Sequence, residues 1–126
     1  MLSLTIQKLG DVTVYRCAGK LTAGQGDDLR RMVTSQPPLR LVVLDLAGIS
    51  TVDAAGLGTL VLLLRWAQAT GREFKLMNVV PRVEQLLQLT NLKSVFAFCS
   101  VREVLDLMCR AARQTQFAAA ATQLVA

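Results

Sequence analysis

Residues 41–66 read LVVLDLAGISTVDAAGLGTLVLLLRW, and this stretch decides how the rest of the chain is interpreted. Residues 41–46 form an apolar run rich in β-branched side chains, which is typical of a strand buried on both faces of a parallel sheet. Residues 47–52 mix small and polar side chains, which predicts a loop. Asp53 predicts a helix N-cap, because its carboxylate can accept hydrogen bonds from the free amides of a first helical turn. Beyond it, apolar residues recur at the spacing of an amphipathic helix, at Leu57, Leu60, Val61 and Leu64.

The junction between this strand and this helix is where we expect function. In open α/β sheets, partners and ligands dock where strands end and helices begin, because loops converge there and free N–H groups point outward. The site is therefore predicted at Asp53, for which ordinary helix capping is the alternative role. Asp45 lies within the buried strand and is expected to be structural, held by partners such as loop amides.

The rest of the chain alternates between strand and helix patterns. The predicted elements are a hairpin over residues 1–18, a helix over 27–34, the central strand and helix, a strand over 73–79, a helix starting at Pro81, a strand over 95–99 and a helix capped by Ser100 and Glu103. Gly71 and Asn91 are suited to the left-handed positions that end two of the helices. The order β-β-α-β-α-β-α-β-α predicts an α/β fold with a mixed sheet, antiparallel in its amino-terminal hairpin and covered by helices.

Length and composition predict one domain with a substantial core. The chain has 126 residues, of which 52% are hydrophobic and 18% charged. We assign residues 1–113 to the domain and 114–126 to an alanine-rich tail or an extension of the last helix. The net charge is +5, but the 14 Lys and Arg residues are scattered, which argues against nucleic-acid binding.

Several kinds of chemistry are excluded by the residue types. The chain has no His, and its three cysteines lack the spacing of a zinc site, so we expect no metal and no cofactor. Cys17, Cys99 and Cys109 each lie in an apolar stretch and are expected as buried free thiols in a reducing compartment. Asp45 and Asp53 have no nucleophile or base beside them, so an enzyme is not expected. No signal peptide or membrane span is visible, which predicts a cytoplasmic protein.

The central helix carries a second apolar arc opposite its core stripe. At 100° per residue this arc contains Ala55, Thr59, Leu62, Trp66 and Ala69. Exposed Leu and Trp side chains often mark a protein interface. We therefore predict that the arc, together with Asp53, docks a partner. The alternative is that the carboxyl-terminal helix or tail covers it.

Four pieces of the sequence stand at distances typical of one family. They are Leu44-Asp45-Leu46 with Ile49, Val52-Asp53 with Gly56-Leu57-Gly58, Gly71, and Asn78-Val79-Val80-Pro81 followed by Val83, Leu86, Leu89 and Asn91-Leu92. In this arrangement the chain resembles the STAS domain of bacterial anti-sigma factor antagonists as far as about Met108. The resemblance implies a STAS-like (SpoIIAA-like) mixed sheet.

The resemblance also implies which residues bind a partner. In this family, a Ser directly after the Asp of a D-S-[ST]-G-[LI] motif is phosphorylated, and this breaks the complex with a kinase-type anti-sigma factor. Asp53, Gly56 and Leu57 match the motif, whereas Ala54 stands at the phosphoacceptor position and has no nucleophilic oxygen. We therefore expect the phosphoserine control to be lost. A surviving switch would need another hydroxyl, at Ser50, Thr51 or Thr59.

Two functions follow from the resemblance. The leading hypothesis is a non-enzymatic protein-binding domain that binds a kinase-type anti-sigma factor and so releases a sigma factor, with a role in transcription regulation by partner switching. The alternative is a STAS subunit of a lipid-trafficking ABC transporter, binding the ATPase subunit. Those small proteins commonly keep a hydroxyl beside the Asp, which this chain lacks. Neither function involves nucleic acid or membrane insertion, and the alanine-rich tail leaves a homodimer open.

Overall fold

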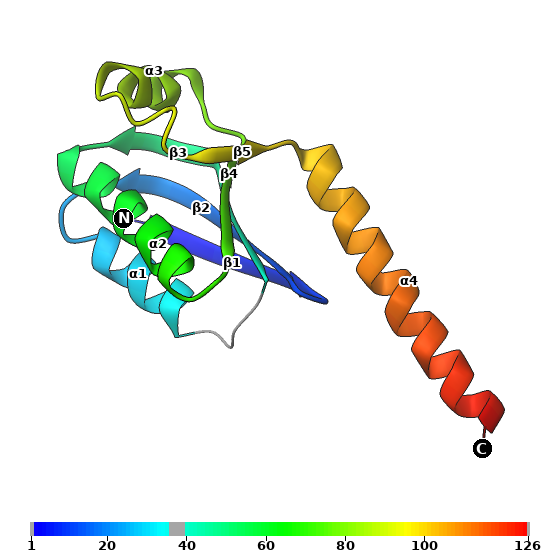
Figure 1. The fold of residues 1–126 in the computed structure, drawn as a ribbon. Helices are drawn as coiled ribbons and strands as arrows, with labels where there is room; N and C mark the ends of the chain where they lie inside the picture. Colours follow the sequence, from blue (N-terminus) through cyan, green and yellow to red (C-terminus); the bar gives the residue numbers. More distant parts are fainter. Residues whose placement is uncertain (1, 36–39, 126) are drawn as a thin grey trace.

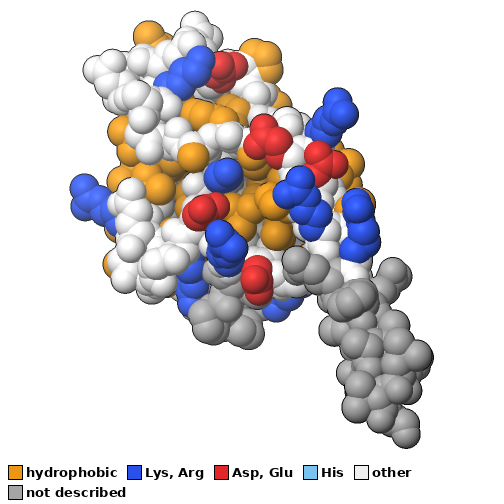
Figure 2. Space-filling model, turned by 45° about the vertical axis from the view of Figure 1, so that its right-hand side comes forward, with side chains coloured by type: hydrophobic (Ala, Val, Ile, Leu, Met, Phe, Trp, Pro, Cys, Tyr) orange, Lys and Arg blue, Asp and Glu red, His pale blue; other side chains and the backbone are white. Residues whose placement is uncertain are grey.

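The computed structural model describes residues 2–35 and 40–125, with side chains as far as Arg113. Its elements are β1 (Leu2–Leu9), β2 (Val12–Leu21), α1 (Gly26–Thr34), β3 (Leu41–Val52), α2 (Ala54–Ala69), β4 (Glu73–Met77), α3 (Pro81–Leu89), β5 (Ala97–Cys99) and α4 (Val101–Val125). The strands form one five-stranded sheet in the order β1-β2-β3-β4-β5. β1 and β2 pair antiparallel, and the other neighbours pair in parallel. The predicted element order and mixed sheet are confirmed (Figure 1). On the face drawn in Figure 2, Lys and Arg side chains are interspersed with acidic and apolar ones.

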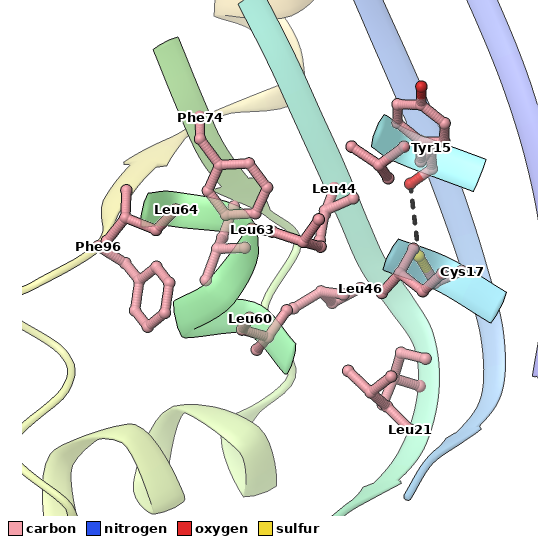
Figure 3. Packing of buried hydrophobic residues seen from close by; sticks show 14 of the residues in the cluster. Tyr15, Cys17, Leu21, Leu44, Leu46, Leu60, Leu63, Leu64, Phe74 and Phe96 are labelled. Atoms are coloured by element: carbon pink, nitrogen blue, oxygen red, sulfur yellow. Dashed lines mark hydrogen bonds between the residues drawn. The ribbon is translucent and has the colours of Figure 1, made fainter. Parts of the chain in front are cut away.

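Helices cover both faces of this sheet (Figure 1). On one face, α1, α2 and α3 share a large hydrophobic cluster with the strands, and Figure 3 shows leucines of α2 directed at those of β3. On the other face, α4 packs through Val104 and Met108 onto a smaller cluster formed by Val12, Val14, Leu41, Val43 and Met77. Because β3 lies between these two layers, it is buried on both sides, which explains its unbroken apolar run.

The prediction of a loop over residues 47–52 is wrong, because β3 continues without interruption to Val52. This second half pairs in parallel with β2 through two shifts of register. Gly48 permits the close pairing, since a Cβ at that position would lie 2.9 Å from the Cβ of Ala18. Ile49 is buried in the main cluster. Pairing and burial therefore override the small and polar composition on which the loop prediction rested.

The predicted helix boundaries at Gly71, Pro81, Asn91 and Ser100 are confirmed, whereas the strands predicted over 73–79 and 95–99 are shorter, at Glu73–Met77 and Ala97–Cys99. Gly71 and Asn91 have φ values of 72° and 59°, the left-handed conformation that ends a helix. Beyond Gly71, the amide of Arg72 donates to the carbonyl of Ala67 at 2.8 Å and closes α2 directly before β4. Pro81 occupies the first turn of α3, where its missing N–H has no helical partner to lose.

The last helix begins with the predicted capping interaction, in which the amide of Glu103 donates to Oγ of Ser100 at 3.1 Å. The helix continues to Val125, so residues 114–125 extend it, and Figure 1 shows its end projecting from the body of the domain. A domain boundary after Arg113 stays a prediction. Among the described residues, we find no helix with the length and apolar character that crossing a bilayer requires.

The three cysteines are free, but they are not all buried as expected. Cys17 is buried, Cys99 is half-buried and Cys109 is exposed. Burial raises the pKa of the Cys17 thiol to about 12, so this thiol stays protonated and unreactive at neutral pH. Cys109 is exposed because α4 uses a different face, that of Val104 and Met108, to contact the sheet.

Candidate functional site

Asp53 is the N-cap of α2, as predicted, and it also binds the loop between β2 and α1. Its Oδ1 accepts a hydrogen bond from the amide of Gly56 at 2.8 Å, and its Oδ2 accepts one from the amide of Ala23 at 3.0 Å. These hydrogen bonds favour the ionised form and hold the pKa of the carboxyl below its ordinary value. Because both carboxylate oxygens bind backbone amides, Asp53 fixes the start of α2 against the segment that follows β2.

Gly56 explains how closely α2 approaches the sheet. It is buried, and a Cβ at this position would overlap the carbonyl oxygen of Leu21 at the end of β2. The first turn of α2 therefore rests directly on the backbone of β2. Leu57, the next residue, is buried in the main hydrophobic cluster. The inward residues of the motif thus anchor the helix, and its outward residues are available at the surface.

The outward side of α2 forms a shallow apolar hollow. It is lined by Ala54, Ala55, Leu57, Gly58, Thr59, Val61, Leu62, Arg65 and Leu92, and its volume is about 550 Å³. Ala54, Ala55 and Gly58 are exposed, and Leu62 is 50% exposed. Arg65 is the one charged residue in this lining. We call these residues the α2 surface.

Two members of the predicted arc do not lie as expected. Thr59 is buried, because α1 packs there and a Cβ on Gly26 would overlap its hydroxyl oxygen. Trp66 is half-buried against the main cluster, and the guanidinium of Arg72 lies 4.5 Å from the centre of its ring. The expected accessible arc therefore reduces to Ala55, Leu62 and Ala69, with Trp66 at its border. The described part of α4 packs on the opposite face of the sheet and leaves them uncovered.

The hydroxyl groups near the start of α2 are differently placed. Ser50 and Thr51 lie on β3, with Ser50 exposed and its Oγ donating to the carbonyl of Gly19 at 3.1 Å. Thr59 is 9% exposed, and its hydroxyl donates to the carbonyl of Ala55 at 3.1 Å within the helix. Ala54 is exposed at the first position of α2 and presents a methyl group.

Asp45 has the structural role that its place in the strand predicts. Its Oδ1 accepts hydrogen bonds from the amide of Ala47 at 3.0 Å and from Nδ2 of Asn78 at 3.2 Å. This carboxylate therefore ties β3 to the residue that follows β4. Across residues 2–35 and 40–113, His, Cys, Asp and Glu side chains form no group of three that could hold a metal ion.

Four members of the α2 surface had no predicted binding role, namely Gly58, Val61, Arg65 and Leu92. Val61 had been assigned to the core stripe of the helix instead. Gly58 could have been identified from the sequence as a candidate binding residue, because an exposed glycine inside a helix is unfavourable by about 1 kcal/mol relative to alanine. Arg65 could have been placed by helical spacing. Leu92 could not, since it reaches the hollow from the segment after α3 only through the tertiary fold.

Comparisons with known proteins identify structures with the same fold. An anti-sigma factor antagonist from Mycobacterium paratuberculosis superimposes with a TM-score of 0.69 at 18% identity, covering 86% of this chain and 94% of that one. The phosphorylated Bacillus cell fate determinant SpoIIAA gives 0.65 at 18% identity, with coverage of 82% and 97%. A sulfate transporter family protein from Wolinella succinogenes gives 0.66 at 17% identity, with coverage of 85% and 93%. At these identities the structures establish a common fold. Because the model of the STAS domain matches residues 3–106, this chain belongs to the STAS domain family.

Proposed function

We propose that this STAS domain is a non-enzymatic binding protein that docks a kinase-type anti-sigma factor on its α2 surface and so releases a sigma factor. The observation that carries the proposal is the exposed apolar hollow beside the Asp53 cap. Solvent-facing Leu62 and the bare helix backbone at Gly58 favour contact with another protein, because each is unfavourable on a free surface. The anti-sigma factor antagonist among the structural relatives supports the class of partner.

The binding is constitutive. A phosphoryl group would add about −1.5 to −2 charges to a docking surface and disrupt an apolar contact there. Ala54 offers no oxygen to receive it at the exposed start of α2. Ser50 is exposed but lies on β3, with its hydroxyl donating to a backbone carbonyl. Complex formation is therefore set by concentration and affinity.

Capture from native lysate tests the class of partner. The wild-type chain and a Leu62→Asp variant serve as baits, and bound proteins are identified by mass spectrometry. We expect a histidine-kinase-like ATPase of the anti-sigma type on the wild type and its loss on the variant, since the aspartate places a charge in the apolar hollow. Capture of an ABC transporter ATPase would instead support the alternative function. Equal capture by both baits would exclude the α2 surface.

A reconstituted complex tests the missing switch. With purified partner and ATP, the wild-type chain is expected to gain no phosphate in intact mass and to remain bound. Ala54→Ser restores a hydroxyl at the exposed position, and this variant is expected to become phosphorylated and to dissociate. Ala55→Ser is the matched control one residue further on. Phosphate on the wild-type chain, accompanied by release, would contradict a constitutive binder.

A further inference from the structure

In the part of the chain that the structure describes, the sheet has a free edge at β1. β1 pairs with β2 on one side, and the strand order leaves it at the border of the sheet within the described residues (Figure 1). It is eight residues long, reads LSLTIQKL, and contains a single charged residue and no proline. A long edge strand of this kind presents unpaired backbone groups to another strand.

The register of the hairpin decides which backbone groups face outward. Leu9 pairs with Val12 across a tight turn, and hydrogen-bonded pairs alternate along the strand from there. The odd-numbered residues of β1 therefore bond to β2, and the amides and carbonyls of the even-numbered residues point away from it. Leu2 agrees with this pattern, since its amide donates to Oε1 of Gln25 at 3.0 Å.

The two faces of β1 differ chemically. Leu4 and Ile6 are partly buried against the main cluster on the side of α1 and α2. Ser3, Thr5 and Gln7 are exposed on the opposite side. An added strand must therefore place apolar side chains on the helix side and polar ones on the other. The β1 strand of a second copy, in antiparallel orientation, meets this requirement.

We propose that two copies of this chain form a homodimer by antiparallel pairing of their β1 strands, with Thr5 of each copy on the twofold axis. Leu4 of each copy then faces Ile6 of the other in a hydrogen-bonded pair, using the outward backbone groups of both residues. A register centred on Leu4 would place Leu2, whose amide is held by Gln25, opposite Ile6, and would leave only the Leu4–Leu4 pair free to form its hydrogen bonds. A register centred on Ile6 would set Leu4, in the middle of the strand, against the charged Lys8, whereas the register centred on Thr5 places Leu2 and Lys8 only in its terminal pair.

The side chains of this register match as well as the backbone. Thr5 faces Thr5, a favourable cross-strand pair, and Ser3 faces Gln7. Lys8 is the one charged residue of β1, and it faces Leu2, so no like charges are opposed. A strand from an unrelated protein would satisfy the backbone, but β1 matches itself on both faces. The interface is isologous and separate from the α2 surface, so it does not depend on the proposed function.

Disulfide trapping tests the register. Directly opposed residues in a non-hydrogen-bonded pair have Cα atoms about 4.5 Å apart, within the range of a disulfide. In a Cys109→Ser background, which removes the exposed native thiol, Thr5→Cys is expected to give a cross-linked dimer under mild oxidation. Ser3→Cys is the matched control, because the two Ser3 positions would be about 14 Å apart and should not link.

Charges introduced at Thr5 test the interface without a covalent bond. The wild type is expected to sediment at twice 13.7 kDa as its concentration rises. Thr5→Lys and Thr5→Glu should each raise the dissociation constant about fivefold, and mixing the two variants should restore dimers. Gln7→Lys faces Ser3 and should change the constant by less than about twofold. A monomer at every concentration would overturn the proposal, and so would a dimer that neither lysine nor cysteine at Thr5 affects.

Discussion

Gly58 separates the stability of the domain from its proposed binding role. It lies inside α2, it is exposed, and a Cβ there would meet no atom within 4 Å. Gly58→Ala therefore adds a methyl group without a clash and reduces the conformational freedom of the unfolded chain. We expect the free energy of unfolding to rise by about 1 kcal/mol. For a domain of this length that corresponds to an increase of about 4 °C in Tm.

Urea unfolding followed by circular dichroism at one fixed protein concentration measures this change. Gly56→Ala is the matched control two residues earlier, since a Cβ there would overlap the Leu21 carbonyl oxygen and lie 3.1 Å from Cγ1 of Val52. The backbone cannot move away easily, so this variant should lose at least about 2 kcal/mol. If Gly58→Ala destabilised the domain as Gly56→Ala does, the outward position of Gly58 would be refuted. Weaker partner binding by the more stable Gly58→Ala variant would be the signature of a docking surface.

Three further predictions concern single side chains. The pKa of Asp53 is lowered in the fold, so its ionised form contributes stability that is present above the unfolded pKa of 3.8 and is lost as pH falls through the lower folded value. Thermal unfolding between about pH 5 and pH 2 should show this loss, and Asp53→Asn should flatten it. Thr13 is buried and its hydroxyl has no partner among the described residues, so Thr13→Val should raise the free energy of unfolding by about 1 kcal/mol in urea titrations. Iodoacetamide at pH 8 should label Cys109 in the folded protein and Cys17 only after unfolding; labelling of both at one rate would contradict the described burial.

The sequence predicted the order of strands and helices and most of their ends. It failed at residues 47–52, where small and polar side chains resemble a loop but β3 continues to Val52. Strand pairing there depends on the neighbouring β2, whose contribution is invisible in the local pattern. Gly48 contained a partial signal, since a glycine within a strand indicates close backbone approach.

The candidate site was predicted in part. Asp53 was correctly identified as a cap, because an N-cap carboxylate accepts a hydrogen bond from the backbone amide three residues later, here that of Gly56. A helical wheel placed Thr59 on the outer arc, but it could not show that α1 covers that side of α2. The same limit applies to Cys109, whose exposure follows from which face of α4 meets the sheet.

By itself, the sequence determined what residue type and local spacing decide: a capped helix after Asp53, left-handed ends at Gly71 and Asn91, and an alternating hairpin at the start. Only the tertiary structure decided which side chains remain accessible, because exposure depends on which distant element packs against each face. Leu92 joins the α2 surface and β1 is left at the border of the sheet for that reason.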